Sequence, residues 1–388
     1  MKLRQQPSDF KVEEISEFKI SKTKDNFKLY SLEKSGIETF FLLQYLSKQN
    51  RIPVQEFSVA GLKDKHADTK QYMTLPSNYD LKTLNEQNFK ITFLGYVNSK
   101  IHLGDLTANR FEITVREVLK GELDGIYQKS RNIAEIGVPN YFDSQRFGSA
   151  IYKEFIAKEI MLKNYEKAVK IFLTQYTKSE KKFIKEDKKS ILANWNNLSN
   201  AKIYNGPLKL IVGEYLKTKS WLSAYKKIQG NLREMFVSAY QSYLWNECVK
   251  TLLRQNLDSK AIYSIEYTLG SLLFYKRITQ KEAQSIPETF QTISDELVPK
   301  ESEKKIIEKI LAKEGVSIND FKIKDATGNF FKSRERQVII KPKEFSISNP
   351  KLDDVNDRGR ENRYMITVRF TVPKACYATI IIKRLFNQ

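Results

Sequence analysis

The first third of the chain alternates apolar and polar positions, and this period of two predicts strands. Strands are expected in five segments rich in β-branched and aromatic residues: FKVEEI, FKLYSL, FSVAG, ITFLGYV and RFEITVRE. One helix is expected to interrupt them over residues 38–48, with Phe40, Leu43 and Leu46 on a single apolar face. A second helix is expected over residues 122–136, before Gly137.

The middle of the chain changes to a helical period. Residues 152–192 are rich in Lys and Glu, and within them TKSEKKFIKEDKKS is a charge run that we interpret as a solvated helix face. A long amphipathic helix is predicted over residues 232–253, with its aromatic side chains in the core. Another helix is predicted over residues 301–313, after which RQVIIK, YMITVRFTV and CYATIIIKRLF are predicted to be strands.

Strand-rich ends around a helical middle indicate one sheet domain interrupted by an insertion. We therefore predict a discontinuous domain formed by residues 1–152 and 332–388, with residues 153–331 inserted. The predicted fold class is mixed α/β (α+β). The length of 388 residues agrees with two domains.

The charge of the chain points to a polyanionic partner. It has 66 Lys and Arg against 46 Asp and Glu, a formal net charge of +20. Nucleic acid is the partner expected from such an excess, although a Lys-rich composition shared by many proteins of one genome would also produce it. Signatures of the common DNA-binding motifs are missing, which counts against DNA.

Residue counts exclude several kinds of chemistry. The chain has only two His, His66 and His102, and two distant Cys, Cys248 and Cys376, so neither a metal cluster nor a disulfide scaffold is expected. Glycine-rich phosphate loops are also missing, as are long apolar runs and a secretory leader, which favours the cytoplasm. If the chain is an enzyme, a carboxylate, lysine or tyrosine must carry its chemistry.

The segment AGLKDKHADTKQ, residues 60–71, is the densest local cluster of small, charged and hydrogen-bonding residues. It follows a predicted strand and contains Asp64 between Lys63 and Lys65. Nearby cations favour the ionised form of a carboxyl group, which can then act as nucleophile or base, and a turn at Gly61 could orient it. The alternative is a structural Asp in a strand-to-turn connection.

This segment resembles the AGxKDxxAxTxQ signature of the TruD family of tRNA pseudouridine synthases, in which the aspartate is catalytic. Further segments resemble the family in the same order along nearly the whole chain: PSDFKVEE, ANRFEI, GVPNYFDSQRFG, SAYQSYLWN and VPKACYAT. The resemblance implies a pseudouridine-synthase-type, mainly antiparallel sheet domain split by a largely helical α/β RNA-binding domain. It also implies tRNA as partner, with a uridine in the D-arm region, commonly position 13, as substrate.

By position in these segments, Asp64 corresponds to the catalytic aspartate. The resemblance implies that the target uridine is contacted by Phe10, Asn109 and Tyr377, with Phe111 near the base. Lys63, Arg4 and Arg146 are further substrate-binding candidates, and Arg146 could instead pair with a carboxylate. The family often has Lys near the position of Arg4 and Phe at the position of Tyr377, and both replacements keep a cation or an aromatic plane.

Isomerising uridine to pseudouridine consumes nothing, so no cofactor and no metal are expected. An ionised aspartate could attack C1′, add to C6 or remove the C2′ proton, and the sequence does not choose among these routes. Aromatic side chains could hold a uridine that has left its stack. The rival function is a non-catalytic RNA-binding protein that remodels tRNA. No obligate protein partner is inferred from the sequence.

Overall fold

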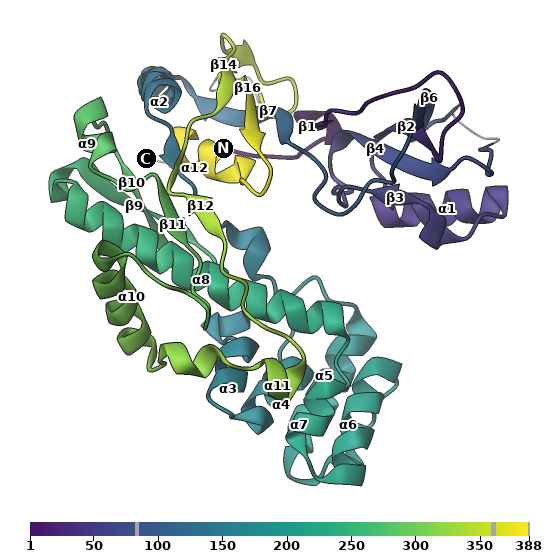
Figure 1. Cartoon of the computed structure of the whole chain (residues 1–388). Helices are drawn as coiled ribbons and strands as arrows, with labels where there is room; N and C mark the ends of the chain where they lie inside the picture. Colours follow the sequence, from purple (N-terminus) through teal and green to yellow (C-terminus); the bar gives the residue numbers. More distant parts are fainter. Residues whose placement is uncertain (82–84, 358–361, 387–388) are drawn as a thin grey trace. The chain divides into compact units, whose positions relative to one another are not determined.

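The computed structural model describes residues 1–81, 85–357 and 362–386, and the chain forms two compact units (Figure 1). Unit 1 contains residues 1–138 and 340–388, and unit 2 contains residues 139–339. The boundaries between the units therefore differ from the predicted ones. Residues 139–152 and 332–339, which were predicted to belong to the discontinuous domain, pack within unit 2. The catalytic and RNA-binding roles given to the two domains stay predictions.

Unit 1 is built on a ten-stranded sheet with the order β14-β16-β7-β1-β4-β2-β6-β5, in which β15 also pairs with β16 and β3 with β4. Its strands are β1 (Phe10–Ile15), β2 (Phe27–Lys34), β3 (Ser58–Val59), β4 (Asp68–Pro76), β5 (Asn85–Glu86), β6 (Phe89–Val97), β7 (Ala108–Leu119), β14 (Lys343–Ile347), β15 (Lys351–Leu352) and β16 (Arg363–Pro373). β1 and β4 pair in parallel, and the other ladders described are antiparallel. The predicted mixed, mainly antiparallel sheet is therefore confirmed.

In the described part of unit 1 there are three α-helices: α1 (Thr39–Asn50), α2 (Leu123–Glu135) and α12 (Ala378–Phe386). The first two confirm the predicted helices. The third shows that the strand predicted for CYATIIIKRLF is wrong. Ile380, Ile381 and Ile382 are buried on α12, which packs against α2. Burial among these neighbours outweighs the strand preference of β-branched residues, which depends strongly on context.

Helix α1 lies on the part of the sheet formed by β2, β4 and β6. Leu42, Leu43 and Leu46 are buried in a core shared with Leu32 and Met73. Burying each of these side chains contributes about 1.5 to 3 kcal/mol. The predicted apolar face was partly wrong, because Phe40 is 45% exposed while Leu42 takes its place.

Neighbouring strands of unit 1 give the sheet two chemically different faces. On the buried face, Val12 of β1 lies opposite Phe111 of β7 and Thr69 of β4. On the charged face, Glu13 of β1 lies opposite Arg110 of β7 and Lys70 of β4. Successive residues of a strand point to opposite sides of a sheet. Alternate residues of β1 and β7 therefore lie on the buried face, and the residues between them lie on the charged face.

Unit 2 is mainly helical. Its helices are α3 (Ile156–Met161), α4 (Tyr165–Thr174), α5 (Lys182–Ala193), α6 (Gly206–Thr218), α7 (Trp221–Lys226), α8 (Gly230–Asn256), α9 (Gln280–Gln284), α10 (Glu301–Glu314) and α11 (Lys324–Thr327). Its hairpins are β9 (Ile262–Tyr267) with β10 (Gly270–Tyr275), and β11 (Thr289–Gln291) with β12 (Glu335–Gln337). β8 (Val138–Pro139) pairs with β13 (Ile339–Ile340) where the chain passes between units. None of the helices in the described ranges has the length and apolarity to cross a membrane.

Two elements of unit 2 bear on the sequence predictions. Helix α8 confirms the long predicted helix, and its Phe236, Tyr240 and Leu244 are buried. Helix α5 carries the charge run, which is not wholly solvated. Lys188 is buried and donates to the carbonyl oxygen of Gln175 at 2.8 Å, so this lysine has a structural role.

Candidate active site

Asp64 lies in the loop of residues 60–67 between β3 and β4. We call this segment the nucleophile loop because Asp64 is the candidate nucleophile, a role that stays a prediction. Its side chain is 56% exposed, and one carboxylate oxygen is 2.9 Å from Nη1 of Arg4. The Arg4 guanidinium also lies 4.0 Å from the ring centroid of Phe10. The structure thus brings three predicted site residues, from separate segments, to one place.

Arg4 is held there by an anchored N-terminal segment. Lys2 forms a two-way main-chain bridge with Arg116 of β7. The buried Arg116 side chain pairs with Asp9 at 2.9 Å and with Asp353 at 3.0 Å. Although burial alone would raise the pKa of Asp353, hydrogen bonds from Asn356, the main chain and Arg116 lower it to about 2. This network fixes the residues on either side of Arg4.

Lys63 does not pair with its neighbour Asp64, contrary to the expected role of a flanking cation. Its ammonium group is 2.6 Å from Glu14, a residue with no exposed surface, and 3.3 Å from Oδ1 of Asn109. Glu14 also accepts a hydrogen bond from the main-chain N–H of Tyr72 at 3.3 Å. Lys63 therefore orients Asn109, and Arg4 is the cation at the Asp64 carboxylate.

The predicted aromatic residues differ in exposure. Phe10 and Phe111 are buried on the buried face, with centroids 6.0 Å apart in an edge-to-face arrangement, and Phe111 also contacts Phe370. Tyr377 is half-buried and lies between the end of β16 and the start of α12, so its prediction as a strand residue is wrong. Only Tyr377 of these three predicted contacts has appreciable exposed surface.

Arg146 belongs to unit 2 and is not among the residues that unit 1 gathers around Asp64. Its Nε donates to Oγ of Ser242 at 3.1 Å, and its guanidinium lies 5.8 Å from the Phe142 ring centroid. These contacts tie it to helix α8. Its predicted substrate contact stays a prediction.

Four residues at this site were missed by sequence reasoning: Glu14, Lys34, Thr39 and Gln71. Glu14 had a signal, because it continues the series Phe10, Val12 at every second position and so falls on the buried face. Lys34 had the same kind of signal, because it continues the series Tyr30, Leu32 at every second position of β2. The expected requirement for glycine at position 61 is not seen in the structure. A Cβ there would meet open space, and the φ of Gly61 is not positive, so another residue could adopt the same conformation.

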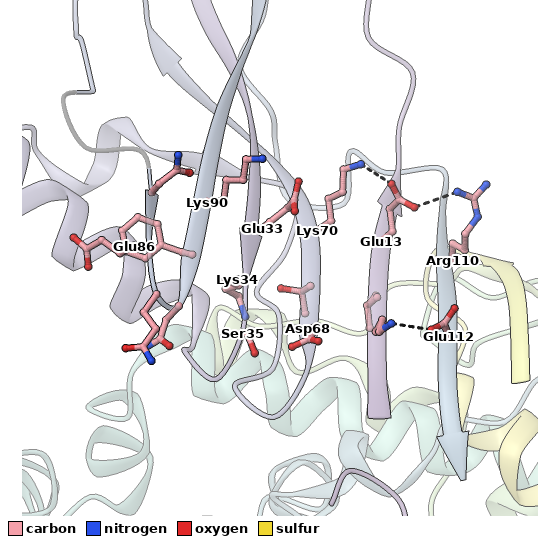
Figure 2. Close-up of a pocket in the computed structure, with 17 residues that line it drawn as sticks. Glu13, Glu33, Lys34, Ser35, Asp68, Lys70, Glu86, Lys90, Arg110 and Glu112 are labelled. Atoms are coloured by element: carbon pink, nitrogen blue, oxygen red, sulfur yellow. Dashed lines mark hydrogen bonds and ion pairs between the residues drawn. The ribbon is translucent and has the colours of Figure 1, made fainter. Parts of the chain in front are cut away.

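A groove of about 850 Å³ lies on the charged face of the same sheet (Figure 2). Figure 2 shows Glu13 between Lys70 and Arg110. The Glu13 carboxylate is 2.9 Å from the Lys70 ammonium group and 3.1 Å from the Arg110 guanidinium, and Glu112 pairs with Lys11 at 2.9 Å. Because cations and carboxylates alternate and neutralise one another here, the groove offers an anion little net attraction. Among the described residues, His, Cys, Asp and Glu form no group suited to hold a metal ion.

An exposed carboxylate beside an arginine, with an amide and aromatic rings nearby, can act as nucleophile or base on a substrate that approaches from solvent. The comparisons with known proteins agree with this chemistry. A family model described as tRNA pseudouridine synthase D (TruD) matches residues 1–385.

Two curated proteins are similar over the whole chain. A probable tRNA pseudouridine synthase D 1 of Methanococcus maripaludis is 39% identical, with 100% of both chains covered. A probable tRNA pseudouridine synthase D 2 of Methanocaldococcus jannaschii is 41% identical, covering 100% of this chain and 92% of that protein. The crystal structure of a putative tRNA pseudouridine synthase D from Methanosarcina mazei shares the fold, with a TM-score of 0.73, 22% identity and coverage of 100% and 93%.

Proposed function

Because the chain belongs to the tRNA pseudouridine synthase D family, we propose that it isomerises one uridine of tRNA, at position 13 in the D-arm region, with Asp64 as its nucleophile. The observation that carries the proposal is the geometry of Asp64. It is the aspartate of the AGLKDKHADTKQ segment, its side chain is more than half exposed, and Arg4 pairs with it. A carboxylate held by one arginine can still reach a bound nucleotide.

The reaction breaks the bond between C1′ and N1 of the uridine and forms a bond between C1′ and C5. N1 gains a proton and C5 loses one, so the base is rearranged without oxidation. Asp64 starts and ends as a carboxylate, whether it attacks C1′, adds to C6 or removes the C2′ proton. Arg4 keeps the carboxylate oriented through a charge-assisted hydrogen bond.

The remaining substrate contacts divide between polar and aromatic groups. Asn109, oriented by Lys63, has an amide that can donate to and accept from the edge of uracil. Tyr377 offers a partly exposed ring, and stacking on an aromatic ring contributes about 1 to 3 kcal/mol per base. Phe10 and Phe111 are buried, and the Arg4 guanidinium lies over the Phe10 ring. Unit 2, where lysines far outnumber acidic residues over residues 153–229, would bind the RNA backbone outside the pocket.

Chemical mapping of pseudouridine in tRNA incubated with the purified chain tests this function. We expect one modified position, at uridine 13, and loss of at least about a thousandfold in rate for Asp64→Asn, because removal of a nucleophile removes the chemical step. The affinity of the variant for tRNA should stay within a few-fold, since Asn preserves the size of Asp.

Asp68→Asn is the matched control. Asp68 lies four residues further along, opposite Lys11 on the charged face, and its substitution should leave turnover near that of the wild type. Near wild-type turnover by Asp64→Asn would refute the nucleophile. A wild-type chain that refolds tRNA without forming pseudouridine would instead support the tRNA-remodelling function.

A further inference from the structure

The nucleophile loop rests on a buried lysine from another strand. Lys34, the last residue of β2, is 4% exposed. Its ammonium group donates to three main-chain carbonyl oxygens: those of Ile37 at 2.8 Å, Lys63 at 3.2 Å and Asp64 at 3.0 Å. A lysine ammonium has three donors, so these three acceptors account for all of them.

Two further buried side chains hold the same stretch of main chain. Oγ1 of Thr39, the first residue of α1, accepts from the N–H of Lys63 at 3.0 Å and donates to Oε1 of Gln71 at 2.9 Å. Nε2 of Gln71 donates to the carbonyl oxygen of Gly61 at 3.2 Å. Buried side chains therefore hold the main chain from Gly61 to Asp64 by hydrogen bonds, whereas the Asp64 side chain is more than half exposed.

We propose that Lys34 is a positioning residue for the proposed nucleophile: by binding the carbonyl oxygens of Lys63 and Asp64 it fixes the loop conformation that presents the Asp64 carboxylate to Arg4 and to the substrate. The inference rests on the proposed function of Asp64. Burying a lysine is costly, and direct pairing with a carboxylate would be the usual compensation. Here the charge is instead directed at the loop main chain, where it orders the one segment that carries the candidate nucleophile.

The same lysine also binds the residue that orients Asn109. Lys63, whose carbonyl oxygen binds Lys34, directs its side chain to Glu14 and Asn109. A shift of the loop would therefore move the candidate nucleophile and the candidate uracil contact together. A displacement of about 1 Å in such a group can cost a hundredfold in rate.

Lys34→Met, which keeps the length of the side chain without its charge, tests the proposal. We expect kcat to fall about tenfold to hundredfold while KM for tRNA changes less than about threefold, because the contacts with RNA are not removed. Lys28→Met is the matched control. Lys28 lies on the same strand, is 7% exposed and donates to the carbonyl oxygen of Tyr79 at 2.8 Å, away from the nucleophile loop.

A readout independent of activity separates this proposal from the proposed function. Amide hydrogen exchange of the peptide covering residues 60–67 should accelerate in Lys34→Met and not in Lys28→Met, whether or not the chain modifies tRNA. If Lys34→Met does not fold, Lys34→Gln serves instead, because it also removes the ammonium group and should raise exchange at the same peptide. Unchanged exchange at residues 60–67 in the folded variant would overturn the proposal.

Restoring the ammonium group completes the test. In a chain with Cys248 and Cys376 replaced by Ala, Lys34→Cys is alkylated with 2-bromoethylamine in denaturant and refolded, which gives a lysine analogue of the same length. Alkylation with 1-bromopropane gives the uncharged isostere. Activity and slow exchange should return only with the amine, and equal recovery by both adducts would contradict a role for the charge.

Discussion

Both faces of the unit 1 sheet carry charged side chains, but they use them differently. On the charged face, Glu13 lies between Lys70 and Arg110 (Figure 2), and Glu13 and Glu112 each pair with two cations at the sheet surface. On the buried face, Glu14 and Lys34 are directed inward, at Lys63 and at the loop main chain.

The difference shows that charge marks a candidate site only together with its partners. A surface ladder of alternating charges contributes little per pair, because both members stay hydrated. A buried charge must be compensated, so its partner is held in a defined position. The residues around Asp64 are placed by charges of the second kind.

The largest expected contrast between the faces is in stability. Glu14→Gln leaves Lys63 without its buried counter-ion and should lower the free energy of unfolding by about 3 to 5 kcal/mol. Glu13→Gln, one residue earlier and on the charged face, should lower it by less than about 1 kcal/mol. Urea denaturation of both variants measures the two values, and equal values would remove the distinction.

The pH dependence of stability should also differ between a lysine of each face. Burial lowers the pKa of Lys34 to about 8. The charges of Asp64 and Glu38 act to raise this pKa, and the charge of Lys63 acts to lower it further. Between pH 8 and 10.5 the unfolded chain binds more protons at this lysine, so its contribution to the free energy of unfolding rises with pH, by up to about 3 kcal/mol.

The free energies of unfolding of the wild type and of Lys34→Met are measured at pH 7.5 and at pH 9.5. On going to the higher pH, the wild type should gain stability relative to Lys34→Met. The corresponding difference for Lys70→Met should stay constant. A hydrogen bond from Lys70 to Glu13 raises the pKa of Lys70, so the contribution of that pair is lost only above pH 10.5. Parallel behaviour of the two lysines would contradict the buried environment of Lys34.

A smaller effect, on turnover, is expected when Arg4, which pairs with Asp64, is replaced, and no effect is expected for Arg110 on the charged face. Arg4→Met should lower kcat about tenfold, because the Asp64 carboxylate loses its orienting hydrogen bond. Arg4→Lys should stay within about threefold of the wild type, since it keeps a cation. Arg110→Met, which breaks a pair with Glu13 on the charged face, should leave kcat unchanged. Single-turnover assays at saturating tRNA compare the three variants.

The smallest effect is expected from exposed lysines in unit 2. Replacing Lys181, Lys182 and Lys189, all exposed, with Gln should weaken tRNA binding and reduce the slope of log K against log salt by about 2 to 3. Lys188 is excluded because it is buried. A matched triple substitution of Lys11, Lys70 and Arg110 should leave the slope unchanged, since carboxylates already neutralise those cations.

Equal slopes for both triple variants would argue against RNA binding by α5. Single-turnover chemistry at saturating RNA should change in neither variant, because neither triple touches the nucleophile loop.

Local pattern was sufficient for the elements that are long or strongly periodic. The strand at Phe10–Ile15 and the helices α1 and α8 follow from their periods of two and 3.6 residues. Asp64 could be selected because the segment around it resembles a family signature along a contiguous stretch. Strand-rich ends around a helical middle indicated one sheet domain with an insertion, whereas the mainly antiparallel pairing was implied by the family resemblance.

Other features depend on residues that are distant in the sequence. Ile380, Ile381 and Ile382 have the preferences of a strand, yet they form a helix because α2 offers an apolar surface to bury them. Lys63 and Asp64 are adjacent in the chain, but Lys63 turns to Glu14 and Arg4 arrives from the N-terminal segment to take its expected place. The burial of Lys34 likewise requires α1 and the nucleophile loop to close over the end of β2. The sequence was therefore enough to identify the candidate chemical groups, but the tertiary structure decided which groups pair. The energy of a charge depends on which partners and how much water surround it, and both are set by packing.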